Sequence, residues 1–394
     1  LVIATLGFAV TFWAWALISP LAPSLATKLG LSSFQQSLIV AVPVIVGSLG
    51  RIPIGALTDR FGGRLMLPIV SVATIVPVLF LAFFGDQSLA TLLIGGFFLG
   101  IGGTSFAVGV PFVSAWFPPE RRGLAIGIFG VGMVGTAISA FTTVRLVEFG
   151  SSATPFLVTA AALAIYAVVA WLLLRDAPGQ VRPTTSMAKR VGETLKLGVT
   201  WQAAALYATL FGGYVAFSVY LPSLLKAEYD LSIGDASNRM AGFVILAVIM
   251  RPVGGFLSDK IGPVPVLATC LGAVVFGALI DATSPALFPI ATIAYLVMAA
   301  GLGAGSGATF ALVALLSPAG KVGSVTGVVG AAGGLGGFVP PLLMGVVYGA
   351  TGSYTIGFLL LALVAAAVLV FTLTSIRSVL AKRDAVEVQR EVAA

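Results

Sequence analysis

The sequence predicts an all-α integral membrane protein with twelve transmembrane helices in two pseudo-symmetric six-helix bundles. Three observations support this fold class: an apolar composition, twelve long apolar segments and an internal repeat. Of the 394 residues, 59% are hydrophobic and 9% are charged, whereas a soluble domain carries about 25% charged residues. This composition excludes an ordinary soluble enzyme, a disordered chain and a nucleic-acid-binding protein, so we expect the lipid bilayer as a partner and no nucleic acid.

The apolar segments are long enough for helices that cross a bilayer. A spanning helix needs about 20 mostly apolar residues, whereas barrel strands show about ten residues of alternation. In the first half the expected spans are 1–26, 37–57, 64–84, 88–117, 123–147 and 153–175. In the second half they are 201–225, 237–257, 263–282, 286–317, 321–349 and 353–378. No cleavable signal is expected, because residues 1–26 lack a basic leader and are too long for one.

One long polar segment separates the two halves. We expect an N-terminal bundle over 1–176, a cytoplasmic linker over 177–200 with a helical part at 187–196, a C-terminal bundle over 201–380 and a cytoplasmic tail over 381–394. If both termini are cytoplasmic, the outer loops hold only four of the 21 basic residues: Lys28, Arg145, Lys226 and Arg239. Basic residues favour the cytoplasmic side. The bias predicts a multi-pass protein of the cell membrane (inner or plasma membrane) with both termini in the cytoplasm.

Two segments recur at an offset of 200 residues. The identities in the first segment are Arg51, Gly55, Leu57, Asp59 and Gly62, which recur as Arg251, Gly255, Leu257, Asp259 and Gly262. Those in the second are Pro118, Gly123, Gly127 and Gly130, which recur as Pro318, Gly323, Gly327 and Gly330. Such a repeat implies two bundles related by an axis along the membrane normal, with a binding site between them near the midplane. The repeat therefore predicts a transporter.

Two arginines are expected inside the membrane. Arg51 lies about 12 Å along the helix from Asp59, and Arg251 has the related position in the eighth span. An arginine at the bilayer centre costs about 2.5–3.5 kcal/mol on insertion scales. All fourteen acidic residues lie in loops, tails or span ends, so we expect the arginines to lack carboxylate partners and to bind an anionic ligand. Their planar fork suits a flat oxyanion. The alternative is that one arginine is structural and bonds backbone carbonyls at helix breaks.

Other chemistries find little support in the sequence. A single cysteine, Cys270, and the absence of histidine exclude a Cys/His metal site, so no metal or cofactor is expected. An enzyme would need convergent acid–base groups or a metal, and none is evident. A sensor would need an added signalling domain, and the tail after Lys382 is too short for one.

Glycines are concentrated in the fifth and eleventh spans, at 123–135 and 323–337. Small residues let helices approach closely. The segment Gly130-x-Gly132-x-x-Gly135 formally matches a dinucleotide-binding fingerprint. It lacks the preceding strand that such a site requires, so we reject the match.

The loop after the second span carries a family resemblance. Residues 55–64, Gly-Ala-Leu-Thr-Asp-Arg-Phe-Gly-Gly-Arg, resemble the major facilitator superfamily signature between helices 2 and 3, and residues 255–262 look like its weaker copy. The resemblance implies that Gly55, Asp59, Arg60 and Asp259 brace the cytoplasmic gate. The alternative is a polar turn with a solvated charge cluster.

The glycine-rich segments resemble the paired signatures of the nitrate/nitrite porter family within that superfamily. The resemblance implies that Arg51 and Arg251 bind nitrate or nitrite, and that rings of Phe106, Tyr207 and Phe211 sandwich the anion. It also implies sliding glycine faces, made of Gly127, Gly130, Gly132, Gly330, Gly333 and Gly334. On their own, the aromatic residues also fit core or lipid-facing positions. Two positions depart from the family pattern, since Met133 and Ser306 stand where asparagines are typical; Ser306 keeps one hydrogen-bond donor.

The sequence as a whole predicts a secondary active transporter of nitrate and/or nitrite that works by alternating access, as in nitrate assimilation. Both nitrate/nitrite antiport and nitrate/proton symport stay open. Antiport is favoured because the chain has no histidine and no intramembrane carboxylate to carry a proton. The alternative is a major facilitator carrier for a small organic anion, a mono- or dicarboxylate, which the missing amides suit. We expect a monomer that is not an enzyme.

Overall fold

The computed structural model describes residues 1–178, 187–318 and 322–380. Within these ranges, twelve helices are long and apolar enough to cross a membrane. The first half contains α1 (Val2–Trp15), α2 (Ile18–Leu29), α3 (Ser33–Leu49), α4 (Arg51–Phe61), α5 (Gly63–Phe84), α6 (Leu89–Leu99), η1 (Gly100–Thr104), α7 (Ser105–Trp116), α8 (Pro119–Gly130), η2 (Val131–Val134), α9 (Gly135–Phe149) and α10 (Thr154–Leu173).

The second half follows a short helix in the linker, α11 (Met187–Thr194), which agrees with the helical part expected there. It contains α12 (Gly198–Tyr229), α13 (Ile233–Ile261), α14 (Pro263–Asp281), η3 (Leu287–Ala291), α15 (Thr292–Leu316), α16 (Val322–Gly336), α17 (Val339–Thr351), α18 (Thr355–Phe371) and η4 (Thr372–Ile376). The rest of the predicted linker at 179–186 and the predicted tail at 381–394 lie outside the described residues. The predicted domain boundaries stay predictions.

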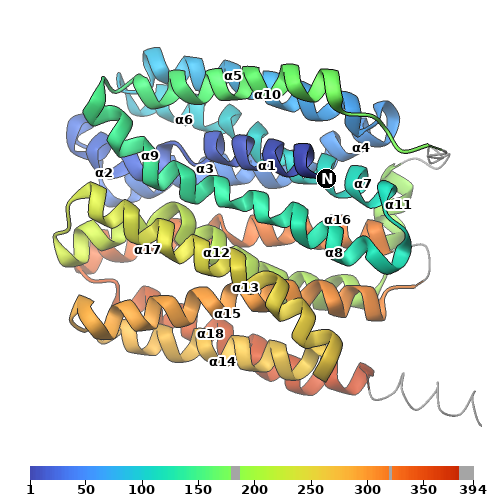
Figure 1. Cartoon of the computed structure of the whole chain (residues 1–394). Helices are drawn as coiled ribbons and strands as arrows, with labels where there is room; N and C mark the ends of the chain where they lie inside the picture. The colour runs from blue at the N-terminus through green and yellow to red at the C-terminus, as the bar shows by residue number, and fades with distance from the viewer. Residues whose placement is uncertain (179–186, 319–321, 381–394) are drawn as a thin grey trace, which may run out of the picture.

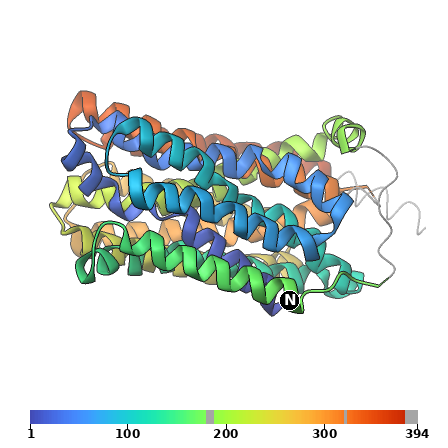
Figure 2. The ribbon, with the colours of Figure 1, turned by 90° about the horizontal axis from the view of Figure 1, so that it is seen from above.

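All the long helices run along one direction, with the two halves stacked on each other (Figure 1). Helices α5 and α10 of the first half lie at one edge, and α14 and α18 of the second half lie at the other. The view from above shows the same alignment of the helix axes (Figure 2). We call the end where α1 begins and α4 ends the terminal face, and the end where α2 ends and α3 begins the far face.

Several helices extend past their predicted limits because polar residues continue them beyond the apolar stretch. The second and eighth spans run over Ser33–Phe61 and Ile233–Ile261, about one turn longer at each end than expected. The side chain of Ser32 accepts a hydrogen bond from the Gln35 amide, and Ser232 accepts one from the Asp235 amide. These caps satisfy amides that would otherwise lack a partner at the helix start.

The backbone repeats the 200-residue offset seen in the sequence. Gly62 and Gly262 follow α4 and α13 with φ/ψ of 86°/155° and 85°/154°, a conformation open to glycine and strained for other residues. Gly30 and Asp230 both take positive φ at the preceding loops. Ser19 and Val219, which are themselves related by the offset, meet through a hydrogen bond from the Ser19 hydroxyl to the Val219 carbonyl. The pseudo-symmetry axis therefore passes between α2 and α12.

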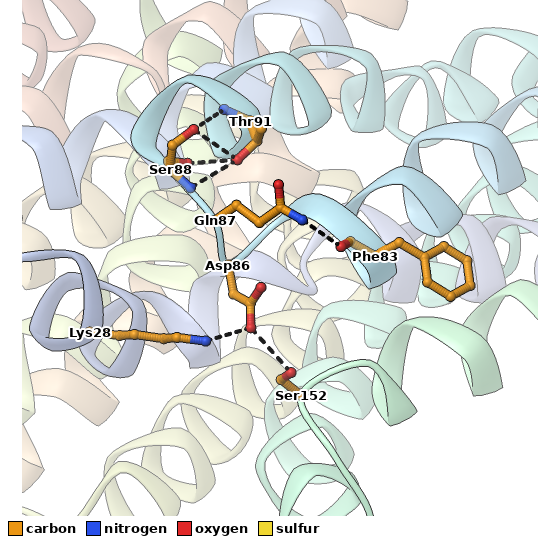
Figure 3. A network of polar contacts seen from close by, with 7 residues as sticks. All are labelled: Lys28, Phe83, Asp86, Gln87, Ser88, Thr91 and Ser152. Carbon is orange, nitrogen blue, oxygen red and sulfur yellow. Dashed lines mark hydrogen bonds and ion pairs between the residues drawn. The ribbon is translucent and has the colours of Figure 1, made fainter.

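The two halves are joined toward the far face. Arg145 Nη1 donates to Asn238 Oδ1 over 3.0 Å, which links α9 to α13. A Cβ added at Gly345 of α17 would overlap the Ser37 side chain of α3, so these two helices touch at a glycine, as in close membrane packing. At the far-face loops of the first half, Lys28 donates to Asp86, which also accepts from Ser152 (Figure 3).

Asp281 is a buried carboxylate. It ends α14 with 3% of its surface exposed, and in the described part of the chain neither carboxylate oxygen has a hydrogen-bond partner. The helix end was predictable from hydropathy. The burial was not, because it depends on the way α12 and α15 pack around that end.

Candidate functional site

Arg51 lies at a break between two helices. Helix α3 ends at Leu49, Gly50 intervenes, and Arg51 begins α4 with 9% of its surface exposed. Its Nε donates to the Gly103 carbonyl over 3.4 Å, and its Nη1 donates to the Gly330 carbonyl over 2.8 Å. Gly103 lies in η1, whereas Gly330 belongs to the second half. Arg51 thus bonds backbone carbonyls, as the structural alternative expects, but one of these bonds ties the two halves together.

Arg251 occupies the related place in α13 and also reaches across to the other half. Its Nη2 donates to the Tyr207 hydroxyl over 2.7 Å, and its Nη1 lies 2.8 Å from the Met133 sulfur of η2. The guanidinium carbon lies 5.8, 5.4 and 5.7 Å from the ring centroids of Tyr207, Phe211 and Phe310. At these distances a ring face attracts a cation. The Arg251 guanidinium is therefore surrounded by three aromatic rings and contacts the thioether of Met133.

Among the described residues, neither arginine forms an ion pair with a carboxylate. Each is hydrogen-bonded, but to neutral acceptors. Two ion pairs elsewhere in the described residues join Lys28 to Asp86 and Arg239 to Asp235. Neutral acceptors orient a guanidinium without cancelling its charge, so the site keeps a positive field inside the membrane.

Aromatic rings line the site from both halves, including the three that the sequence predicted. The Tyr207 and Phe211 rings are parallel, with centroids 4.6 Å apart. Phe106 lies 5.2 Å from the Arg51 guanidinium and packs against Phe8 and Phe129. The structure thus brings the predicted aromatics to the predicted arginines.

Phe310 is a site residue that sequence reasoning missed. Its ring packs edge-on to Tyr207 at 4.7 Å. A signal was present, since Gly307 lies one turn before it in α15. A Cβ at Gly307 would overlap the Arg251 carbonyl, so the glycine brings α15 against α13 and sets Phe310 beside Arg251.

The glycines of α16 face the site. A Cβ added at Gly333 would overlap the Tyr207 ring and lie 3.0 Å from the Phe211 ring, and one at Gly334 would overlap Ser48 of α3. At Gly330 the Phe106 ring would lie 3.6 Å away. In the other glycine-rich span, Gly132 packs against Phe8, whereas Gly127 and Gly130 have no described atom within 4 Å of an added Cβ. The second-half glycine face therefore fits the site closely, and the first-half face is only partly covered.

A narrow cavity of about 10 Å³ lies beside Arg51 between the two halves. Its walls are Phe12, Trp15, Val44, Gly47, Ser48, Arg51 and Gly103 of the first half, with Val215 and Gly334 of the second. In the described ranges no three His, Cys, Asp or Glu residues are grouped as metal ligands would be. The arrangement provides two cationic forks, aromatic faces and a small enclosed space.

The family model of the Major Facilitator Superfamily matches residues 4–240 and 203–391. The "Probable nitrate/nitrite transporter NarK2" of Mycobacterium tuberculosis is 48% identical over 381 residues, which cover 96% of each chain. The "Nitrite extrusion protein" of Bacillus subtilis is 36% identical over 92% of this chain and 90% of that protein. The chain belongs to the nitrate/nitrite porter family of the major facilitator superfamily.

Solved structures show the same fold in more distant proteins. A D-xylose-proton symporter matches with a TM-score of 0.74 over 95% of this porter and 96% of that chain, at 16% identity. A bacterial homolog of the human lysosomal transporter Spinster, in an inward-facing and occupied conformation, matches with a TM-score of 0.73 over 95% and 96%, at 19% identity. These likenesses establish the fold of the porter.

The loop signature of this porter lies at the terminal face, apart from the arginines. Gly55, Asp59 and Arg60 belong to α4, and Asp259 lies in the last turn of α13. Arg60 lies 5.3 Å from the Phe61 ring. Asp176, which the sequence did not single out, follows α10 and accepts a hydrogen bond from the Arg64 amide over 2.9 Å. This carboxylate caps α5 and holds the loop against the end of α10.

Ser306 is buried in α15 of the porter, and its hydroxyl donates to the Leu302 carbonyl of the same helix over 2.6 Å. This hydrogen bond to the backbone uses the single O–H donor of Ser306. Its predicted contribution to anion binding stays a prediction.

Proposed function

We propose that this porter carries nitrate, nitrite or both across the membrane by alternating access of a site between its two halves. The observation that carries the proposal is the pair Arg51 and Arg251. They occupy related positions, and each bonds the opposite half, at Gly330 and Met133. The names of the relatives support the choice of anion, and the positive field supports an anion in general.

In this proposal a flat anion lies between the two guanidinium groups. Each planar fork offers parallel N–H donors that match two oxygens of an oxyanion. The rings of Phe106, Tyr207 and Phe211 flank the anion. The Ser306 hydroxyl of α15 would add a donor by rotating away from the Leu302 carbonyl that it now bonds. Because the empty site holds two like charges, closing it without an anion is unfavourable. This repulsion favours obligatory exchange, so nitrate/nitrite antiport is preferred over nitrate/proton symport.

The glycine faces would let the halves rock around the bound anion. Gly330, Gly333 and Gly334 lie against the site, with Gly127, Gly130 and Gly132 as their first-half counterparts. The charged loop residues Asp59, Arg60 and Asp259, with Gly55, would brace the terminal face when it closes.

We place the porter in the cell membrane as a monomer, with the terminal face in the cytoplasm. The bias of basic residues supports this orientation. The far-face bonds Arg145–Asn238 and Ser19–Val219 would then close the site to the outside.

A small carboxylate is the second candidate substrate. It is favoured by Met133, whose thioether faces Arg251 where the family typically has an amide. A thioether is a weak acceptor and no donor, so the site is less polar there than a typical family member.

Counterflow in proteoliposomes tests the proposal. Vesicles are preloaded with isotopically labelled nitrate, external nitrite, nitrate, formate or succinate is added, and release is followed without a pH gradient. We expect nitrite and nitrate to release the label. Release by carboxylates alone would support the second candidate and contradict the first.

Conservative arginine variants test the site itself. Lysine keeps the charge of Arg51 or Arg251 but loses the fork. Hydrogen bonds to charged groups contribute about 1.5–3 kcal/mol, which corresponds to about a 10- to 150-fold loss of exchange rate. Lys226→Arg, at the far-face end of α12, is the matched control and keeps the wild-type rate. Wild-type exchange by either lysine variant would overturn the site assignment.

A further inference from the structure

An elongated apolar groove lies on the second half, away from the interface between the halves. Its volume is about 310 Å³. Helix α12 forms its floor with residues that include Ala208, Ala216 and Leu224, and α17 and α18 form its walls with residues that include Val339 and Val364. The groove is separate from the cavity beside Arg51, with which it shares no lining residue.

The groove is continuous with the outer apolar surface of the spans. Val339 and Val364 at its edges are 59% and 50% exposed, and Leu363 beside them on α18 is 64% exposed. Because these residues belong to membrane-spanning helices, the groove opens toward hydrocarbon. Apolar spaces of this kind do not hold water, which needs two to four polar partners.

The groove is long in the direction of the membrane normal. From Leu224 to Ala208 it follows α12 for about 24 Å, at 1.5 Å per residue. One leaflet contributes about half of a hydrocarbon core of about 30 Å. Leu224 lies near the far face, so the groove runs from the far-face leaflet past the middle of the membrane. Its inner end adjoins Tyr207, the neighbour of Ala208 and a member of the anion site.

The groove also lies against the break in the eleventh span. Gly336 lines it, and a Cβ at Gly336 would overlap the Ala208 carbonyl. Pro340 and Pro341 have no N–H to donate to the carbonyls of Gly336 and Gly337, so α16 and α17 are joined without continuous helical hydrogen bonds. Contacts with neighbouring groups therefore have to stabilise the junction of α16 and α17.

We propose that this groove binds one acyl chain of a phospholipid from the far-face leaflet, and that the chain supports the junction of α16 and α17. The elongated shape and apolar walls suit a hydrocarbon chain, and the lateral opening admits one from the bilayer. The chain replaces side-chain packing at the point where the helix lacks its own hydrogen bonds. The assignment is independent of the transported anion.

Photolabelling in vesicles tests the assignment. The full chain is reconstituted in phosphatidylcholine containing a trace of phosphatidylcholine with a diazirine in the middle of one acyl chain. After illumination, labelled peptides are mapped by mass spectrometry. We expect label concentrated on α12, α17 and α18 at the groove, several-fold above other lipid-facing helices.

Groove-filling variants provide the comparison. Ala216→Phe fills the groove and Val364→Trp blocks its mouth, where a partly exposed position keeps the risk to folding small. Both reduce the labelling of α12 several-fold. Ala367→Phe, on the exposed side of α18 and outside the groove, is the control and leaves labelling unchanged. Even labelling of all lipid-facing helices, or labelling that ignores both groove variants, overturns the assignment. So does labelling by a free photoactivatable fatty acid when the phospholipid probe gives none.

Discussion

Replacing Gly333 by alanine tests whether the glycine face of α16 must fit the anion site. In this conformation the added methyl group would overlap the Tyr207 ring and lie 3.0 Å from the Phe211 ring. Tyr207 is fully buried, and its hydroxyl is fixed by a 2.7 Å bond from Arg251. The ring has no free space to enter, so either the ring or α16 has to shift.

The expected magnitude follows from the cost of overpacking. Inserting a methyl group into a well-packed core costs about 1–3 kcal/mol, which shifts a two-state equilibrium about 5- to 150-fold. The conformation seen in this structure loses this stability. A conformation in which α16 has moved away from the Tyr207 ring does not lose it. We therefore expect exchange of labelled nitrate for nitrite to slow by about 5- to 150-fold in Gly333→Ala.

Gly327→Ala is the matched control on the same helix. An added Cβ there meets no described atom within 4 Å, and alanine has the higher helix propensity, so exchange stays at the wild-type rate. Initial rates are measured in proteoliposomes containing equal amounts of each protein. Equal rates for Gly333→Ala and Gly327→Ala would refute the reasoning, because the close fit of Gly333 would then have no role in the cycle.

Three further predictions concern residues away from the arginines. Asn238→Ala removes the hydrogen-bond acceptor of Arg145 and weakens the contact between the halves at the far face. A cysteine introduced at Ser37 in a Cys270→Ser background then reacts faster with a thiol reagent added from the far side. An unchanged reaction rate would contradict a closing role for this bond. Asp281→Leu replaces a buried carboxyl group that has no hydrogen-bond partner among the described residues. Because burying an unpartnered polar group is costly, the melting temperature in detergent rises; a fall would mean that the carboxyl group is compensated. The hydrogen bond from Lys28 holds the pKa of Asp86 below its usual value, so the pair contributes stability above the ordinary aspartate pKa and loses it as pH falls through the lowered pKa. The pair is partly exposed and contributes less than about 1 kcal/mol, so thermal melts of wild type and Asp86→Asn differ slightly at pH 7 and converge in acid; a constant difference at all pH values would contradict the assignment.

The sequence was sufficient to predict the positions of the twelve spans and to single out the two arginines. Both predictions rest on the cost of placing charged groups in a membrane. Burying a charge in a membrane is expensive, so Arg51 and Arg251 stand out from an apolar background. Their related positions followed from the repeat. The aromatic residues Phe106, Tyr207 and Phe211 needed the family resemblance, because rings are common on every face of a membrane helix.

The sequence was not sufficient for features that depend on hydrogen bonding or on contacts between halves. Hydropathy counts apolar residues and does not predict the helix break at Gly50. This break places Arg51 at the start of α4. It also gives no sign that the Gly103 and Gly330 carbonyls accept from Arg51. Met133 was identified as a departure from the family pattern, but its contact with Arg251 depends on how the two halves meet.

The Arg51–Gly330 bond connects the anion site to the helix that has to move. The Gly330 carbonyl is a neutral acceptor, whereas an anion adds the attraction of opposite charges to its hydrogen bond with the guanidinium. An anion arriving at Arg51 therefore competes favourably for the N–H group that now holds Gly330. Losing that bond frees α16 from the first half, while the anion neutralises the charge that keeps the halves apart. Under the proposed function, one guanidinium thus both recognises the substrate and controls the position of α16, and this coupling requires the fork of an arginine because a single ammonium group cannot hold two acceptors in a fixed plane.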